Sequence, residues 1–198
     1  AGQGSDDGHY IHSFVHRACR ILKGKGYSVN SMNMGWGSQT STQYEGFARD
    51  AVSAFKPEIM LYSTYTTNDT APTQTLMDQA FARGMEFADF CKRAGTLPVF
   101  VFLAGNNLNY TPENDRLRKN LIERAKRSGI PVFDANPVTT GNGIPAIPLT
   151  GMLAANGADT VHLSDLGNET VAAAFAPELA RLIDENFSDV RIAKTWRS

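Results

Sequence analysis

The stretch Leu97-Pro-Val-Phe-Val-Phe-Leu-Ala104 decides the fold class of this chain. It is a short, unbroken apolar run with β-branched and aromatic side chains, which is typical of a strand buried on both faces of a parallel sheet. Weaker apolar stretches occur before and after it in the sequence. They predict three more strands, at residues 27–34, 58–65 and 130–134.

Helical patterns alternate with these strands. Between Ile11 and Leu22, for example, apolar residues recur at spacings of three and four, as they do on the buried face of a helix. The sequence predicts helices at residues 8–23, 44–55, 73–94, 112–128 and 168–185, the last of them bent at Pro177. This alternation predicts an α/β fold, a three-layer α/β/α sandwich with a parallel, flavodoxin-like sheet.

The composition limits the classes of function. The 198 residues suit one domain, and 42% hydrophobic with 20% charged residues is typical of a globular rather than a disordered chain. A formal net charge of −1 argues against a dedicated nucleic-acid binder, which needs a concentrated basic surface. No apolar run approaches the ~18 residues of a membrane span. We expect neither nucleic acid nor membrane as a partner.

Two cysteines, Cys19 and Cys91, fall on predicted helices. They are either two buried thiols or the two halves of one disulfide, and a disulfide would favour an oxidising compartment. Three histidines at residues 9, 12 and 16 share one helical face. They form either a solvated flank or a metal-binding face, and no carboxylate or thiol partner accompanies them. The basic residues of helix 112–128 alternate with acidic ones, which predicts an ion-paired surface rather than a polyanion site.

Polar residues and glycines lie beyond the carboxyl ends of the predicted strands, where parallel α/β sheets bind ligands. Asn68 follows strand 58–65, and its amide suits either an oxyanion donor or a turn. Gly35 follows strand 27–34 and either offers its N–H to a ligand or forms a tight turn. Ser5 precedes the first helix, as either a nucleophile favoured by the helix dipole or a capping residue.

Asp159 and His162 stand three residues apart shortly before the last helix. In a tight turn a carboxylate beside an imidazole fixes the tautomer of the ring and stabilises the imidazolium form. The same two residues would also suit an ordinary polar surface turn. Each of these signals is weak alone, whereas their order along one α/β chain is specific.

Ser5, Gly35, Asn68, Asp159 and His162 together resemble the sequence blocks of the SGNH (GDSL-like) hydrolase family. The resemblance spans nearly the whole chain. It implies that Ser5 is the nucleophile, His162 the general base and Asp159 the orienting carboxylate. The Gly35 N–H and the Asn68 side chain would contribute to the oxyanion hole with the Ser5 N–H. The implied reaction is ester hydrolysis through an acyl-enzyme, without metal or organic cofactor.

The chain departs from the family pattern in its first block. Gln3-Gly4-Ser5 replaces Gly-Asp-Ser, and only four residues precede Ser5, so the strand that the family has there is missing. We expect an upstream segment or a second chain to supply that strand. The alternative is that residues 189–198, a C-terminal tail after a domain spanning residues 1–188, fill its place. The missing strand leaves Ser38 and Ser63 as rival nucleophiles.

The substrate is indicated only by loop residues. Asn106, within Gly105-Asn-Asn-Leu-Asn-Tyr110, suits either sugar hydroxyls or an ordinary turn. Trp36 and Tyr65 are either core residues or the floor of a groove. These residues favour removal of a small acyl group such as acetate from a saccharide. The alternatives are a lipid or thioester hydrolase, an acyltransferase, or a catalytically silent glycan-binding module of a larger extracellular or virion protein.

Overall fold

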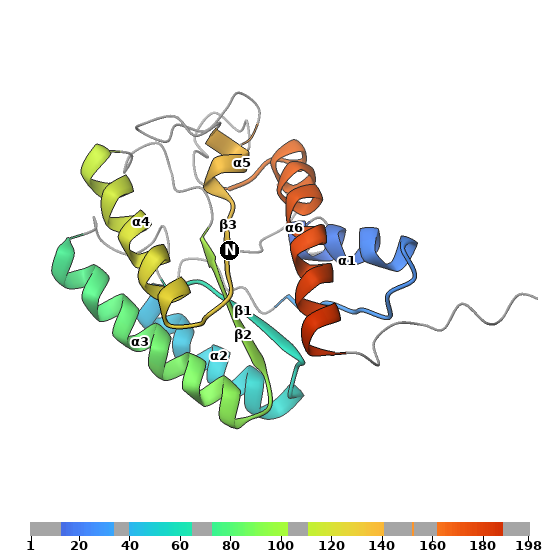
Figure 1. Cartoon of the computed structure of the whole chain (residues 1–198), viewed down its shortest axis with the longest axis horizontal. Coiled ribbons are helices and arrows are strands. Elements are labelled where there is room, and N and C mark those ends of the chain that lie inside the picture. Colours follow the sequence, from blue (N-terminus) through green and yellow to red (C-terminus); the bar gives the residue numbers. More distant parts are fainter. Residues whose placement is uncertain are drawn as a thin grey trace, which may run out of the picture. The chain divides into compact units, whose positions relative to one another are not determined.

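A computed structural model describes residues 13–33, 40–64, 73–102, 111–140, 152 and 162–187. These residues form six helices and three strands (Figure 1). In chain order they are α1 (Phe14–Gly24), α2 (Ser41–Phe55), β1 (Ile59–Tyr62), α3 (Gln74–Arg93), β2 (Leu97–Phe102), α4 (Pro112–Arg127), β3 (Val132–Asp134), α5 (Asn136–Thr140) and α6 (Asp165–Asn186).

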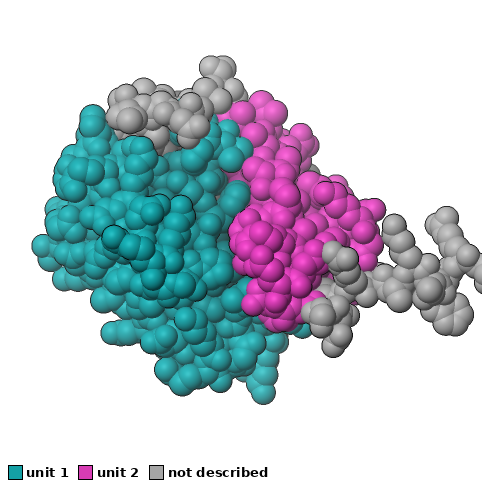
Figure 2. Space-filling view, in the orientation of Figure 1, with its two compact units in different colours: residues 1, 34–149 teal, residues 2–33, 150–198 magenta. Residues whose placement is uncertain are grey.

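The chain divides into two compact units, which Figure 2 colours separately. Unit 1 consists of residues 34–149 together with residue 1, and it contains the sheet with α2 to α5. Unit 2 consists of residues 2–33 and 150–198, and it contains α1 and α6. Unit 2 is therefore built from the two ends of the chain.

The sheet of unit 1 has the order β1-β2-β3, and both neighbouring pairs are parallel. Tyr62 of β1 stands opposite Phe100 of β2, and Phe102 stands opposite Asp134 of β3. The parallel α/β class predicted from the sequence is confirmed. Over the described residues, β1 begins one residue later than predicted, at Ile59, and β3 begins two residues later, at Val132.

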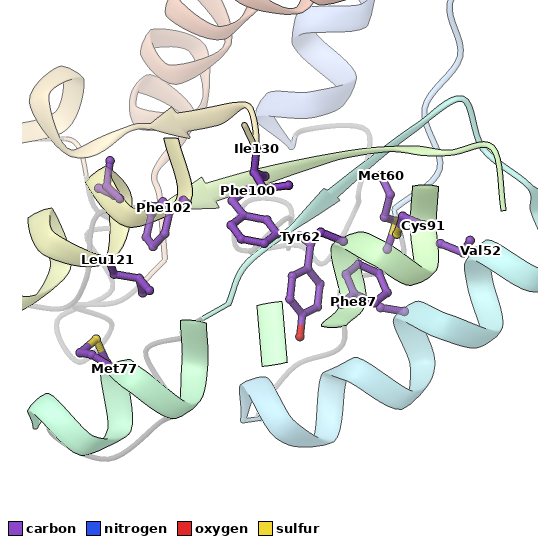
Figure 3. Packing of buried hydrophobic residues seen from close by; sticks show 14 of the residues in the cluster. Val52, Met60, Tyr62, Met77, Phe87, Cys91, Phe100, Phe102, Leu121 and Ile130 are labelled. Atoms are coloured by element: carbon purple, nitrogen blue, oxygen red, sulfur yellow. The ribbon is translucent and has the colours of Figure 1, made fainter. Parts of the chain in front are cut away.

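Strand β2 is the centre of the core. Its residues from Pro98 to Phe102 are all buried, so both of its faces are covered. On one face Tyr62, Phe87 and Phe100 pack together, with 4.2 Å between the ring centroids of Tyr62 and Phe87 (Figure 3). The apolar cluster around them joins α2, α3 and α4 to that face of the sheet.

Local capping signals explain where the helices begin. Helix α2 starts at Ser41, three residues before the predicted start, because Thr40 and Gln43 form a capping box. Helix α6 starts at Asp165 rather than at Asn168, since the Ser164 hydroxyl caps it. It runs on through Pro177. The short helix α5 falls in a region where the sequence predicted neither a helix nor a strand.

The predicted strand at residues 27–34 is wrong over the residues that the structure describes there. Residues 28–33 form no strand, and Tyr27 makes an isolated bridge only. None of the residues from Tyr27 to Asn33 is buried, and Met32 is 59% exposed. An alternating pattern needs a buried face to hold it in a sheet, and this stretch has none. Its Asn30 and Ser31 side chains instead bond to Lys23 and His16 of α1.

The first helix is also shorter than predicted. Ser13 has extended backbone angles and its hydroxyl accepts a hydrogen bond from the N–H of His16, so α1 begins at Phe14. Ser13 therefore caps this helix. Ser5 lies outside the described residues, and its role as a nucleophile remains a prediction.

The expectations of buried thiols and of an ion-paired helix at residues 112–128 are confirmed. Both cysteines are free thiols buried in helices, Cys19 in α1 and Cys91 in α3, and burial raises the pKa of the Cys91 thiol to about 11. Helix α4 is ion-paired, with bridges such as Arg116 to Glu113 and Lys126 to Glu123. None of the helices within the described ranges is long and apolar enough to cross a membrane.

Candidate active site

Of the site residues predicted from the sequence, the structure describes His162. The others lie outside the described residues, and so do Ser38 and the tail at residues 189–198. They are Ser5, Gly35, Trp36, Tyr65, Asn68, Asn106 and Asp159. The structure thus shows His162 and the residues around it in unit 2 and, separately, the strand ends of unit 1.

His162 is exposed and lies three residues before the first residue of α6. Ser164 caps this helix: its hydroxyl accepts a hydrogen bond of 2.9 Å from the N–H of Gly167. Ser164 has extended backbone angles, so the chain changes direction between His162 and the helix. His162 thus lies two residues before the capping residue of α6.

A second contact secures this turn from the outside. The N–H of Ser164 donates to the Met152 carbonyl over 3.0 Å, so the chain leaves Met152 and returns beside it after His162. Gly167 permits this approach, because a Cβ at that position would lie 2.1 Å from the Met152 oxygen. Gly167, five residues after His162, therefore serves a close backbone approach.

The start of α6 is also tied to the start of α1. The Asn168 Oδ1 atom accepts from the N–H of Phe14 over 3.0 Å, across 154 residues of sequence. The Asn168 amide nitrogen donates to the Leu163 and Ser164 carbonyls, at 3.1 and 3.0 Å. Asn168 is 2% exposed, and its bond with the Phe14 N–H is shielded from water.

Two ion pairs reinforce the same tie on the surface. The guanidinium of Arg17 in α1 contacts Asp165 and Glu169 of α6, each over 2.6 Å. Helices α1 and α6 lie side by side in Figure 1, and Phe14 meets Phe175 edge to face with 5.7 Å between ring centroids. The two helices of unit 2 therefore form one body held by apolar packing and by polar bonds at the start of α6.

In unit 1, polar residues lie at the carboxyl ends of β1 and β3. Ser63 and Thr64 follow β1, so Ser63 does not lie inside a strand as expected, but directly after one. Thr64 is buried, and its hydroxyl has no hydrogen-bond partner within the described residues. Asp134 ends β3 and accepts from the N–H and the side-chain amide of Asn136, which starts α5.

Known proteins resemble this chain in structure rather than in sequence. No family model matches it, and no curated protein matches it either. Among solved structures, the lipase/acylhydrolase from Enterococcus faecalis has a TM-score of 0.69 at 17% identity, covering 91% of each chain. A GDSL-like lipase from Bacteroides thetaiotaomicron has a TM-score of 0.63 at 17% identity, covering 85% of this chain and 82% of its own.

A third solved structure is a psychrotrophic esterase from Pseudoalteromonas sp. inhibited by monoethylphosphonate. Its TM-score is 0.65 at 8% identity, over 89% of this chain and 90% of that one. The chain has the SGNH hydrolase fold. The predicted fold class is thereby confirmed, and the solved SGNH-fold structures include named lipases, esterases and acylhydrolases.

Asn168 was not among the site residues predicted from the sequence of this SGNH-fold chain. Its signal was present in the apolar stripe of α6, where Asn168 precedes the buried residues Val171, Phe175 and Leu179 at helical spacing. A polar residue on a buried stripe indicates a specific hydrogen-bond partner. The pattern reveals that such a partner exists, but not that it is the backbone of Phe14.

The described part of this SGNH-fold chain contains no cluster of three His, Cys, Asp or Glu side chains that could hold a metal ion. His16, one of the three histidines considered for a metal face, has its Nδ1 atom 3.3 Å from the Ser31 hydroxyl. His9 and His12 lie outside the described residues.

Proposed function

We propose that this chain is a serine esterase of the SGNH type. The observation that carries the proposal is an exposed histidine, His162, on a capped helix start of an SGNH fold. Asp159 precedes this histidine by three residues, as the family pattern requires. Ser5 and Asn68 complete the pattern in the expected order along the chain.

In the proposed mechanism the Ser5 hydroxyl attacks the ester carbonyl carbon, and His162 takes the hydroxyl proton. The resulting oxyanion receives hydrogen bonds from the Ser5 and Gly35 N–H groups and from the Asn68 amide. The ester C–O bond then breaks, and His162 returns the proton to the departing alcohol oxygen. Water then gives a proton to His162 and bonds to the acyl carbon through its oxygen. The bond from that carbon to the Ser5 oxygen breaks, the acid leaves, and His162 returns the proton to the Ser5 oxygen.

Asp159 would hold the ring of His162 in the tautomer that accepts the proton from Ser5. The backbone around His162 supports such a role, because Ser164 and Gly167 leave this turn little freedom. The cost of reorienting the base at the moment of reaction is correspondingly small.

For the substrate we propose a small acyl group, such as acetyl, on a saccharide. Trp36 and Tyr65 would face a sugar ring, and Asn106 would bond its hydroxyl groups. A lipid or thioester substrate is the alternative within the same chemistry, since solved structures of this fold include lipases and acylhydrolases.

The test is covalent labelling of the purified chain with a fluorophosphonate, followed by peptide mapping of the adduct by mass spectrometry. The reagent phosphonylates only an activated serine. We expect the adduct on Ser5, its loss in Ser5→Ala, and labelling slowed by orders of magnitude in His162→Ala. Ser53→Ala, on the exposed side of α2, is the matched control and should label like the wild type.

An adduct on Ser63 or Ser38 would overturn the nucleophile assignment and leave the esterase chemistry standing. A folded chain that forms no adduct and cleaves no p-nitrophenyl acetate would overturn the proposed function. That result would instead favour the silent glycan-binding module, which binding to acetylated and deacetylated oligosaccharides would then identify.

A further inference from the structure

Asn168 satisfies three backbone groups at once. Its carbonyl oxygen accepts from Phe14, and its amide nitrogen donates to Leu163 and to Ser164. An amide is the only uncharged side-chain group that offers an acceptor and two donors together. The match between this side chain and its surroundings is therefore complete and specific.

The place of these bonds sets them apart from ordinary helix capping. Ser164 already caps α6 through Gly167, so Asn168 is not needed for that purpose. Its two donated bonds hold the residues directly after His162. Its accepted bond holds the first N–H of α1, the helix that follows Ser5 in the chain.

We propose that Asn168 is a positioning residue for catalysis, which fixes the backbone after His162 against the start of α1. The inference rests on the proposed function, because it assigns His162 as the base and Ser5 as the nucleophile. A shift of about 1 Å between such groups lowers turnover by about a hundredfold without abolishing substrate binding. Asn168 itself touches no substrate.

The first test compares two asparagine variants at opposite ends of α6. Asn168→Asp keeps the acceptor for the Phe14 N–H but replaces the amide donor by an oxygen that faces two carbonyl groups. Asn186→Leu removes the bond from the Asn186 amide to the Leu182 carbonyl, which has the same four-residue spacing as the bond from Asn168 to Ser164. Both are assayed with p-nitrophenyl acetate and with the fluorophosphonate.

We expect Asn168→Asp to lower kcat and the labelling rate by about tenfold to a hundredfold, with KM within about twofold of the wild type. Asn186→Leu should change neither. A purely structural role would lower the melting temperature and leave the kcat of the folded protein unchanged, and that outcome would overturn the inference.

Arg17→Met separates positioning from stability. Arg17 also ties α1 to α6, but through exposed carboxylates rather than through the backbone after His162. We expect it to lower the melting temperature and to keep kcat within about twofold. A loss of kcat equal to that of Asn168→Asp would overturn the special role of Asn168.

Asn168→Ser provides a second variant if the aspartate variant does not fold, since a hydroxyl still donates one of the two bonds. Its kcat should lie below the wild type, and a wild-type kcat would overturn the inference. Failure of the proposed function is distinguishable, because then the wild-type chain itself forms no Ser5 adduct. An active wild type with unaffected Asn168 variants refutes the positioning role alone.

Discussion

The contacts within the sheet region of unit 1 differ in kind from the contacts within the helix pair of unit 2. Around β2 the contacts are mostly between apolar side chains, such as the packed rings of Tyr62, Phe87 and Phe100. Between α1 and α6, apolar packing is joined at one end by directional polar bonds from Asn168 and Arg17. Apolar packing stabilises a fold in proportion to the apolar surface that it buries. Hydrogen bonds and ion pairs depend on direction, so they also fix how one helix is placed along the other.

We infer from this difference that the two regions contribute differently to stability and to the placement of His162. The apolar region supplies most of the stability, because it buries large aromatic and aliphatic side chains away from water. The polar ties supply less free energy and hold the segment after His162 in a defined place. Four substitutions test this contrast, beginning with the largest expected effect.

Phe100→Ala should destabilise the protein most. Phe100 is fully buried at the centre of the apolar cluster, so its removal leaves a cavity and lowers the free energy of unfolding by about 3–5 kcal/mol. Urea unfolding measures the loss. Phe47→Ala on α2, where the ring is 42% exposed, is the control and should cost less than about 1 kcal/mol. Equal losses would refute the central role of β2.

Asp115→Asn breaks the one nearly buried ion cluster of the described sheet region. The Asp115 carboxylate, 3% exposed, pairs with Arg118 and Lys119, and Arg118 also pairs with Asp134. Removing this charge leaves its cationic partners less well compensated, so we expect a loss of about 3 kcal/mol at neutral pH.

The same carboxylate predicts an acid dependence. Burial would raise the pKa of Asp115, but hydrogen bonds from Lys119 and Arg118 outweigh burial and hold the pKa below its usual value. The stabilisation is therefore present above the unfolded-state pKa and is lost as the pH falls through the lower, folded-state pKa. Below about pH 4 the wild type should lose stability more steeply than Asp115→Asn. Parallel slopes in urea titrations would contradict this.

Gly167→Ala tests the close approach behind His162. The new Cβ would collide with the Met152 carbonyl, so we expect a loss of about 1–3 kcal/mol together with reduced esterase activity. Gly46→Ala in α2 is the matched control. Nothing lies within 4 Å of its Cβ position, so alanine should stabilise that helix by about 0.5–1 kcal/mol. Thermal melts of the two variants should shift in opposite directions.

Arg17→Met should have the smallest effect. Its carboxylate partners Asp165 and Glu169 are more than half exposed, so each pair contributes less than about 1 kcal/mol and is screened by salt. The difference in unfolding free energy from the wild type should shrink further at about 1 M salt. A loss as large as that of Phe100→Ala would contradict the inferred difference between the two regions.

Much of the fold followed from local patterns. The apolar run around Phe100 identified the central strand, and helical spacing identified α1 to α4 and α6 with errors mainly at their ends. The missed starts of α2 and α6 were readable as capping signals at Thr40 and Ser164. The strand expected at residues 27–34 did not form over the described residues. Alternating apolar and polar residues are compatible with a strand, but only packing against other elements decides whether the segment joins a sheet.

The candidate site was less accessible to the sequence. The order of Ser5, Gly35, Asn68, Asp159 and His162 indicated the family, and the fold agrees with it. The supports of His162 were not predictable, because a hydrogen bond across 154 residues leaves no periodic trace. Asn168 was visible only as a polar residue on an apolar stripe.

The sequence by itself determined the α/β class, the parallel sheet and the ion-paired face of α4. Short-range periodicity and charge spacing encode those features directly. Only the tertiary structure decided that Gly167 meets the Met152 carbonyl and that Asn168 joins the start of α6 to Phe14. Such contacts depend on where distant segments meet, and directional bonds between them form only once packing has brought them within reach.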